Sequence, residues 1–276
     1  MTVLKDRVCE LRPAFRPVDP VSRTVYEPGE VVQCDVWFPS AGVPLGFGQT
    51  GRPLVLVLVL VMVCGYSRWV TALVLSSRSA AGLIAGHWRL LTDLGGVPRS
   101  LVWDNEGAVG SWRPGGPRLT EEFAAFAGLL GVKFVLCKPR DPEAKGLVER
   151  ANGYLETSFL PGGRSPRWPT STSSWLAGCR RATGGPPESA GQAGRAAGGG
   201  PVPDAAAAAG VSAVLVEEPL RLPRDHYVRL DICDYSVHPL AVGRRIEVSA
   251  DLEQGLAFCD GGRVARHARV MSPVVV

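Results

Sequence analysis

The chain has 276 residues, enough to bury the cores of one or two domains, and its formal charge of +4 is compatible with nucleic acid binding without demonstrating it. Seven cysteines are scattered without a C-x-x-C pair and four histidines are equally dispersed, which argues against a structural zinc site or a disulfide framework and favours a reducing cytosol. The most apolar run, at 54–63, is about half as long as a bilayer-spanning helix, and the first residues lack the apolar core of a signal peptide, so we expect a soluble, cytoplasmic protein with no membrane partner.

Residues 1–27 are polar and contain prolines, and we interpret them as a lead-in segment. The segment VVQCDVWF at 31–38 then alternates apolar and polar positions with the period of a strand. The run at 54–63 has the composition of a strand that is buried on both faces. RWVTALVL at 68–75 follows it after a short glycine-containing turn, which predicts a β-hairpin.

Alternating helices and strands are predicted next. Ser79 can cap a helix that ends at Gly95, and SLVW at 100–103 is a short strand. Thr120, followed by two glutamates, opens a second helix, and KFVLC at 133–137 is a further strand. A third helix begins with Asp141 as its cap and Pro142 in its first turn. This order predicts a mixed α/β domain over residues 28–160.

The remainder of the chain divides into two parts of different character. Residues 161–213 are rich in Gly, Ala and Pro and poor in large aliphatic side chains, so they cannot bury enough apolar area to offset the entropy of ordering. From residue 214 to 276 short alternating strands resume, and Asp260-Gly261-Gly262 is a hairpin signal. We expect a linker and then a small all-β domain, whose eight arginines give it a basic surface.

Two aspartates fall where they could share a metal site. Asp35 lies in mid-strand, where an aspartate is disfavoured by propensity and by burial unless it is paired or metal-bound. Asp104 leaves a strand that could lie beside the first one. Turn formation is the alternative explanation for Asp104 and also accounts for the following Asn105.

The third acidic candidate is Glu149 on the last predicted helix. An apolar stripe there should pack on the sheet, and a polar stripe flanks it at the same spacing, formed by Lys145, Glu149, Asn152 and Glu156. An exposed glutamate, or an ion pair between Lys145 and Glu149, is the ordinary alternative. Two strand aspartates and a helix glutamate suit a pair of Mg²⁺ ions, which stabilise the attacking and leaving oxygens of a phosphoryl displacement.

Three segments carry a family resemblance: QCDVWF, VWDNEGA and KPRDPEAKGLVERANGYLETSFLPG resemble the catalytic core of integrase-type DDE transposases. The IstA transposases of bacterial insertion sequences are the most similar family. The resemblance covers about 7–161 and resumes near 214. It implies an α/β, ribonuclease-H-like mixed sheet with flanking helices, followed by a small all-β, barrel-like domain. It also makes Asp35, Asp104 and Glu149 the catalytic, metal-binding triad.

The same resemblance implies how the protein acts on DNA. Lys145 and Asn152 resemble residues that touch DNA near the cut. Lys138, Arg140 and Arg150 could bind phosphate, and solvated surface charge is the alternative for each. With two Mg²⁺ ions, for which Mn²⁺ can substitute, water frees a 3′-hydroxyl at the end of the element, and this hydroxyl attacks target DNA.

Partners also follow from the resemblance: the DNA of the element ends and the target, an AAA+ helper ATPase that selects the target, and further copies of the chain on DNA. The expected location is the bacterial cytoplasm, at the nucleoid.

Two features depart from the family. The N-terminal helix-turn-helix domains of full-length relatives have no counterpart before the core, which leaves recognition of specific ends in question. Residues 161–210 replace a helical region, and we hypothesise that they are translated out of frame, with a flexible linker as the alternative. Two other functions therefore stay open: a ribonuclease-H-like nuclease without strand transfer, and an inactive, truncated transposase remnant with residual DNA binding.

Overall fold

A computed structural model describes residues 6–8, 10, 24–39, 43–46, 49–51, 58–75, 77–139, 145–159, 215–230 and 233–270 of the chain. The low-complexity segment at 161–210 and the proposed helix cap Asp141 lie outside these residues, so the linker and frameshift hypotheses stay predictions. No helix within the described ranges is long and apolar enough to cross a membrane.

A five-stranded mixed sheet forms the centre of the first half, in the order β5-β4-β1-β6-β9. β1 (Val31–Trp37), β4 (Leu58–Cys64) and β5 (Val70–Leu75) pair antiparallel, and β6 (Ser100–Trp103) and β9 (Lys133–Leu136) continue the sheet parallel to β1. The predicted strand, hairpin and two later strands are confirmed, and the predicted adjacency of the strands that carry Asp35 and Asp104 is confirmed with them.

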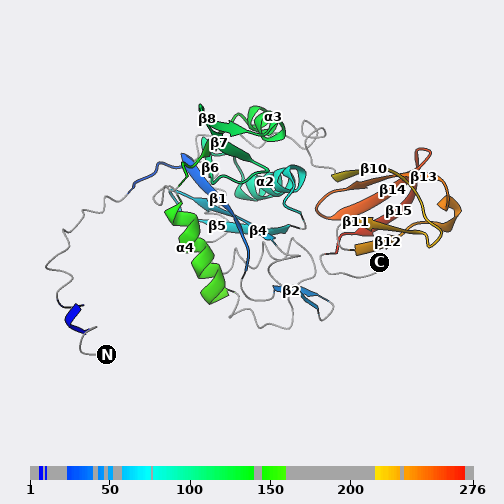
Figure 1. Ribbon diagram of the computed structural model, residues 1–276, viewed down its shortest axis with the longest axis horizontal. Helices are drawn as coiled ribbons and strands as arrows, with labels where there is room; N and C mark the ends of the chain where they lie inside the picture. Colours follow the sequence, from blue (N-terminus) through cyan, green and yellow to red (C-terminus); the bar gives the residue numbers. More distant parts are fainter. Residues whose placement is uncertain are drawn as a thin grey trace.

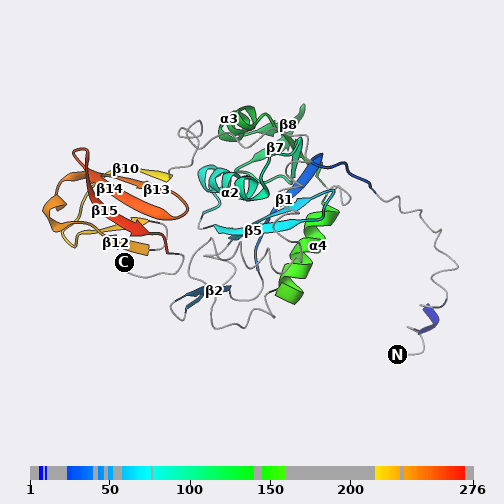
Figure 2. The same ribbon diagram turned by 180° about the vertical axis from the view of Figure 1, so that it is seen from behind.

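Helices cover both faces of this sheet. α2 (Ala80–Leu94) and α3 (Glu121–Leu130) lie on one face, and α4 (Gly146–Tyr154), continued by one π-helical turn (Leu155–Phe159), lies on the other (Figures 1 and 2). A hydrophobic core lies on each face of the sheet, and β4 contributes to both, because alternate residues of its apolar run point to opposite faces. Leu60 and Met62 pack on the α2 side, whereas Val59 and Val61 pack on the α4 side.

The helix ends follow the local signals in the sequence. The Ser79 hydroxyl accepts a hydrogen bond from the Gly82 amide, and the Thr120 hydroxyl accepts one from Phe123. Gly95 ends α2 in the left-handed conformation, with φ of 78°, which a glycine adopts without a steric cost. Both helix starts are therefore confirmed.

Two short hairpins were not predicted. β2 (Val43–Gly46) pairs with β3 (Gln49–Gly51), and β7 (Gly110–Arg113) pairs with β8 (Gly116–Leu119). In the second hairpin Gly115 and Gly116 have φ values of 106° and 115°, so the turn depends on glycine. Each of these strands has only three or four residues, which is too short to give a period-two signal above the background.

The C-terminal region is all-β in its described parts, as predicted. A four-stranded sheet has the order β10-β13-β14-β15, made of Leu215–Arg221, Arg245–Ala250, Gln254–Cys259 and Gly262–Ala268. A separate hairpin joins β11 (Tyr227–Leu230) to β12 (Cys233–Ser236), and a 3-10 turn spans Pro239–Ala241. The predicted Asp260-Gly261 turn is confirmed, with φ of 48° and 77° at its two residues.

This β region lies beside α2 in both ribbon views (Figures 1 and 2). Arg89 of α2 forms an ion pair of 2.6 Å with Glu253, which lies between β13 and β14. The neighbouring Leu252 is half-buried and packs against the hydrophobic core between the central sheet and α2. An apolar contact and an ion pair thus join the two parts of the chain within the ranges that the structure describes.

Candidate active site

The parallel pairing of β1 with β6 places two aspartates next to each other. Val31, Val32 and Gln33 lie opposite Ser100, Leu101 and Val102. Continuing this register by two residues sets Asp35 opposite Asp104: Asp35 lies within β1, which runs on to Trp37, and Asp104 directly follows the end of β6. The juxtaposition follows from backbone pairing, and it puts two carboxylates where mutual repulsion must be offset.

A single ammonium group lies between the two carboxylates. The Nζ atom of Lys145 is 2.7 Å from Oδ1 of Asp35 and 3.6 Å from Oδ2 of Asp104. Lys145 is only 9 % exposed although it stands at the N-terminus of α4. Lys145 therefore pairs with the strand aspartates rather than with Glu149, which was the ordinary alternative from helical spacing.

Asn152 holds the other oxygen of Asp35. Its Nδ2 donates to Asp35 Oδ2 at 3.0 Å, while its own Oδ1 is buried without a hydrogen-bond partner in the described part of the chain. Lys145 and Asn152 are two helical turns apart, so the predicted polar stripe on α4 does reach the rim of the sheet. The apolar stripe beside it, Val148, Ala151 and Leu155, is buried as predicted.

Glu149 stays apart from the two aspartates. It lies on α4 between Lys145 and Asn152, and its side chain is exposed. Within the described ranges no group of three or more His, Cys, Asp or Glu side chains gathers as a metal-binding cluster. The structure therefore brings Asp35 and Asp104 together and leaves Glu149 on the adjoining helix face.

Asp104 combines the two roles that the sequence left open. Its Oδ1 accepts the Asn105 amide at 2.8 Å, which is turn chemistry, while its Oδ2 faces Lys145. The neighbouring carboxylate, Glu106, accepts three hydrogen bonds of 2.6 to 3.0 Å from Arg78. Because Glu106 is already engaged by a guanidinium, Asp104 is the better candidate for a site shared with Asp35.

The basic candidates differ in where they lie. Lys138 follows β9 and is exposed, and Arg150 is exposed on α4. Arg140 lies outside the described residues. Lys145 and Asn152 are turned toward Asp35, so only Lys138 and Arg150 are open to solvent as phosphate contacts.

Gln33 is a site residue that the sequence did not single out. It is 2 % exposed, and its Oε1 accepts the amides of Leu147 at 3.1 Å and Val148 at 3.2 Å. Its place two residues before Asp35, on the same face of β1, was the available signal. A polar residue in a buried strand position requires a partner, but the sequence does not say which one.

Cys34 lies next to Asp35 but points into the opposite core. Burial is the main cause that raises the pKa of the Cys34 thiol well above its usual value, with Cys64 and Asp35 adding to the effect. A buried, protonated thiol is a poor nucleophile. The chemistry at this edge of the sheet therefore rests on the carboxylates.

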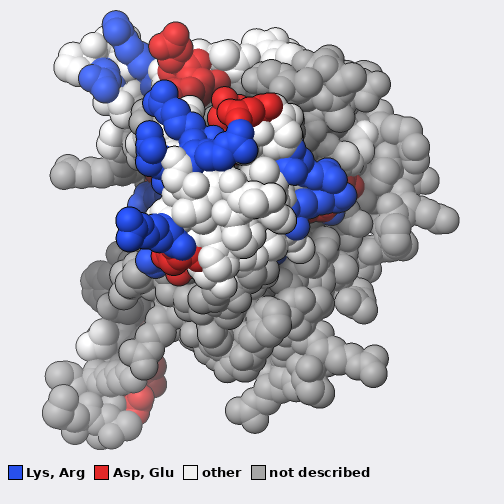
Figure 3. All heavy atoms as spheres, turned by 90° about the vertical axis from the view of Figure 1, so that its right-hand side faces the viewer, with Lys and Arg blue, Asp and Glu red and all other residues white. Residues whose placement is uncertain are grey.

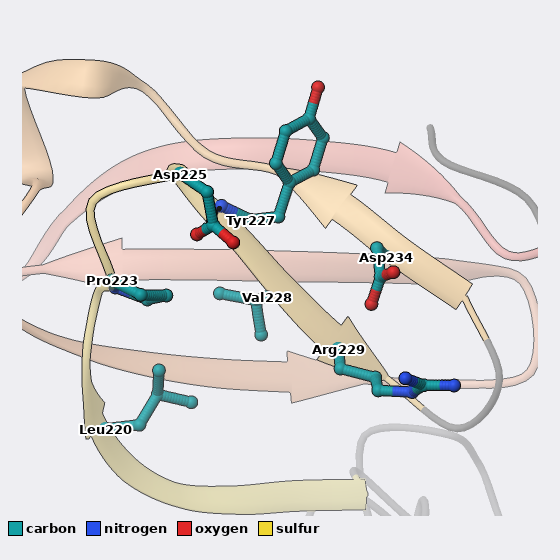
Figure 4. A pocket seen from close by; sticks show the side chains of 7 residues that line it. All are labelled: Leu220, Pro223, Asp225, Tyr227, Val228, Arg229 and Asp234. Atoms are coloured by element: carbon teal, nitrogen blue, oxygen red, sulfur yellow. Dashed lines mark hydrogen bonds between the residues drawn. The ribbon is translucent and has the colours of Figure 1, made fainter.

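A separate hollow of about 450 Å³ lies in the C-terminal β region (Figure 4). Its lining mixes two carboxylates, Asp225 and Asp234, with the guanidinium of Arg229. The outer face of this region carries several basic groups with acidic ones between them (Figure 3). Seven of its arginines are exposed: Arg221, Arg224, Arg229, Arg244, Arg245, Arg263 and Arg266. The eighth, Arg269, is buried and donates to the Asp251 carbonyl.

Two family models match the chain in separate stretches. Residues 25–142 match the integrase core domain, and residues 212–273 match the C-terminal domain of Mu transposase. The first match, the strand order and the helices on both faces together identify the fold as ribonuclease-H-like, followed by an all-β region, as predicted. The resemblance to integrase-type transposases is confirmed for these stretches, whereas the IstA assignment stays a prediction.

One curated relative is a putative transposase for insertion sequence element IS5376 of Geobacillus stearothermophilus. It is 32 % identical over 165 residues, and the match covers 58 % of this chain and 39 % of the relative. The chain thus spans about two fifths of the length of this relative.

Among solved structures, the HTLV-2 integrase catalytic core domain in complex with magnesium is 18 % identical, with a TM-score of 0.41, over 57 % of this chain and 86 % of that one. A simian T-cell lymphotropic virus intasome in complex with PP2A regulatory subunit B56 gamma is 15 % identical, with a TM-score of 0.43, over 94 % of this chain and 84 % of that one.

Proposed function

We propose that this chain is a DDE-type DNA transposase that cleaves DNA strands and transfers them during transposition of an insertion sequence. The observation that carries the proposal is the pair Asp35 and Asp104, set side by side by strand register around one ammonium group. The integrase core match over 25–142 and the transposase relative support the reaction class. Asp35, Asp104 and Glu149 are the proposed metal-binding triad.

The residues present fit a divalent metal of the Mg²⁺ type, with Mn²⁺ as a substitute. Carboxylate and amide oxygens are the donors that such hard cations prefer, and both kinds occur here. The site already holds a positive charge between two carboxylates, and the buried Oδ1 of Asn152 is an oxygen without a partner in the described residues. When bound, two such ions would stabilise the attacking and leaving oxygens at the phosphorus atom.

The side chains of this site have separable tasks. Asn152 and Lys145 fix the two oxygens of Asp35, and the Asn105 amide fixes one oxygen of Asp104. Glu149 adds a third carboxylate from α4, where its exposed position leaves it free to turn toward the aspartates. Once displaced from Asp35 by a metal ion, the ammonium group of Lys145 would be available to form an ion pair with a DNA phosphate.

DNA is the proposed partner, both as element ends and as target. Lys138, Arg140 and Arg150 are proposed to contact phosphates near the core, and the exposed arginines of residues 214–276 extend this basic surface. We further propose that 28–160 is the catalytic core and 161–213 a linker, and that further copies of the chain and an AAA+ helper ATPase assemble with it on DNA in the bacterial nucleoid.

The test is nicking of supercoiled DNA by the full chain with Mg²⁺ or Mn²⁺. Asp35→Asn and Asp104→Asn should each lower the nicking rate by about a hundredfold or more, because each removes charge that stabilises the transition state. Glu106→Gln is the matched control, because it alters the neighbouring carboxylate that Arg78 already engages, and its rate should stay within about threefold of the unaltered chain.

Equal nicking by the unaltered chain and Asp104→Asn, or equal losses in Asp104→Asn and Glu106→Gln, would show that the site is wrongly assigned. A strand-transfer assay with pre-cut element ends separates a transposase from a nuclease that only cleaves. Binding of Mn²⁺ and DNA without nicking or transfer would instead identify an inactive transposase remnant.

A further inference from the structure

The start of α4 has an unusual cap. Lys145 is its N-cap residue, and the Lys145 side chain makes no capping hydrogen bond because an ammonium group has no acceptor; it donates to Asp35 instead. The first amides of a helix nevertheless need acceptors, since they have no partner within the helix. The acceptor comes from the sheet: Gln33 Oε1 receives the amides of both Leu147 and Val148.

This contact links the strand of one candidate metal ligand to the helix of another. Gln33 is two residues before Asp35 on the α4-facing side of β1, and the two amides that it binds are one and two residues before Glu149. Gln33 is 2 % exposed and Val148 is fully buried, so water does not substitute easily for the amide group.

We propose that Gln33 is a positioning residue for the metal site: it sets the height and rotation of α4 so that Lys145 and Asn152 reach the two oxygens of Asp35. This inference rests on the proposed function. Three contacts then define the relation of α4 to β1, namely the cap at Gln33 and the two bonds on Asp35, at 2.7 and 3.0 Å. Loss of the cap leaves α4 packed through its apolar stripe but free to shift along the sheet.

Two substitutions distinguish the effect of the Gln33 acceptor oxygen from the effect of the side chain's volume. Gln33→Leu keeps a side chain of similar size and removes the acceptor. Gln33→Glu keeps an acceptor oxygen, and its negative charge suits a helix N-terminus. The control is Thr71→Val, a buried position on the other face of the sheet whose hydroxyl has no partner in the described residues.

The first measurement is hydrogen exchange of the Leu147 and Val148 amides in the full chain without metal. Gln33→Leu should lower their protection by about tenfold or more, as expected for lost hydrogen bonds in a locally opening segment, while Gln33→Glu and Thr71→Val keep it. Unchanged protection in Gln33→Leu overturns the cap, whether or not the chain binds metal.

The second measurement is Mn²⁺ affinity by electron paramagnetic resonance, made where each variant is fully folded. Gln33→Leu should weaken Mn²⁺ binding by about tenfold, because α4 then no longer holds Asn152 and Glu149 at the site, and this loss outweighs the reduced competition from Lys145. Gln33→Glu should restore most of the affinity. Thr71→Val should leave the affinity unchanged even if it alters the melting temperature.

The outcomes separate this inference from the proposed function. Mn²⁺ binding that does not depend on Asp35 and Asp104 rejects the proposed metal site, whereas site-dependent binding that is equal in the unaltered chain and Gln33→Leu rejects the positioning role alone.

Discussion

At the scale of single residues, Lys145 decides the charge balance of the site. A nearly buried ammonium at 2.7 Å from one carboxylate and 3.6 Å from a second offsets repulsion between the half-buried Asp35 and the exposed Asp104. A divalent cation at the same carboxylates has to displace this ammonium. Lys145 and the metal are therefore expected to compete for Asp35.

Replacing Lys145 by Met should consequently tighten Mn²⁺ binding by about tenfold, since about 1.4 kcal/mol of competing ion-pair energy is removed. Without metal the same variant should melt at a lower temperature, because the carboxylates of Asp35 and Asp104 then face each other without a cation between them. Thermal melts with and without Mn²⁺ measure both effects, with Arg150→Met, on the exposed side of α4, as the control. Weaker Mn²⁺ binding by Lys145→Met would mean that the lysine assists the metal instead of competing with it.

The residue scale also shows what the sequence could predict about the site. The proximity of Asp35 and Asp104 was predictable, because Asp35 lies within one strand, Asp104 leaves another, and the two strands were expected to be neighbours. The partner of Lys145 was not predictable, since helical spacing favoured Glu149 and the family resemblance favoured DNA. The contact from Gln33 to α4 joins positions more than a hundred residues apart, which no local pattern specifies.

At the scale of elements, His87 joins α2 to β6 inside an aromatic cluster. Its Nδ1 donates to the Leu83 carbonyl at 2.7 Å, and its Nε2 accepts from Trp103 Nε1 at 3.1 Å. These roles require the neutral imidazole, because a carbonyl can only accept and an indole N–H can only donate. Three phenylalanine rings surround it, namely Phe123, Phe126 and Phe134.

Burial lowers the pKa of His87 to about 4 from its ordinary 6.5. As the pH falls, His87 therefore takes up a proton in the unfolded chain before it does so in the folded chain. The free energy of unfolding should consequently fall as the pH drops from about 6.5 toward 4. The linkage gives a loss of about 2 kcal/mol between pH 7 and pH 5. Urea unfolding at pH 7, 6 and 5 measures this slope.

Two variants identify the source of that slope. His87→Leu should remove this loss, although Trp103 then loses its acceptor at every pH. Trp103→Phe should keep it, because burial is the larger cause of the shift. A slope that is the same in His87→Leu and in the unaltered chain would assign the acid sensitivity to other groups.

Local sequence signals predicted the ends of helices better than they predicted short strands. Ser79, Thr120 and Gly95 predicted where α2 and α3 begin and α2 ends, because capping depends on a few adjacent residues. The β7–β8 hairpin escaped prediction because each strand has four residues and a half-exposed pattern. The predicted start of the third helix at Asp141 is wrong: Asp141 itself lies outside the described residues, but α4 begins only at Gly146, with Lys145 in a non-helical conformation as its N-cap.

At the scale of the whole molecule, an ion pair and an apolar contact join the core and the β region in the described parts of the chain. The Arg89–Glu253 pair is partly solvated, with 33 % and 54 % of the two side chains exposed, so it contributes at most about 1 kcal/mol. Leu252 adds apolar burial against the core beside α2, worth about 1 to 2 kcal/mol for a half-buried side chain. Among the described residues, these two contacts amount to only a loose connection between the parts.

Leu252→Asp should therefore release the β region, because it places a charge against an apolar surface, whereas Arg89→Ala should change little. Small-angle X-ray scattering of the free chain should give a larger radius of gyration for Leu252→Asp at both low and high salt. Leu256→Asp is the matched control, since it introduces the same charge at a half-buried leucine elsewhere in the β region. Expansion in Arg89→Ala that grows with salt, with no change in Leu252→Asp, would show that charge and not apolar packing holds the two parts together.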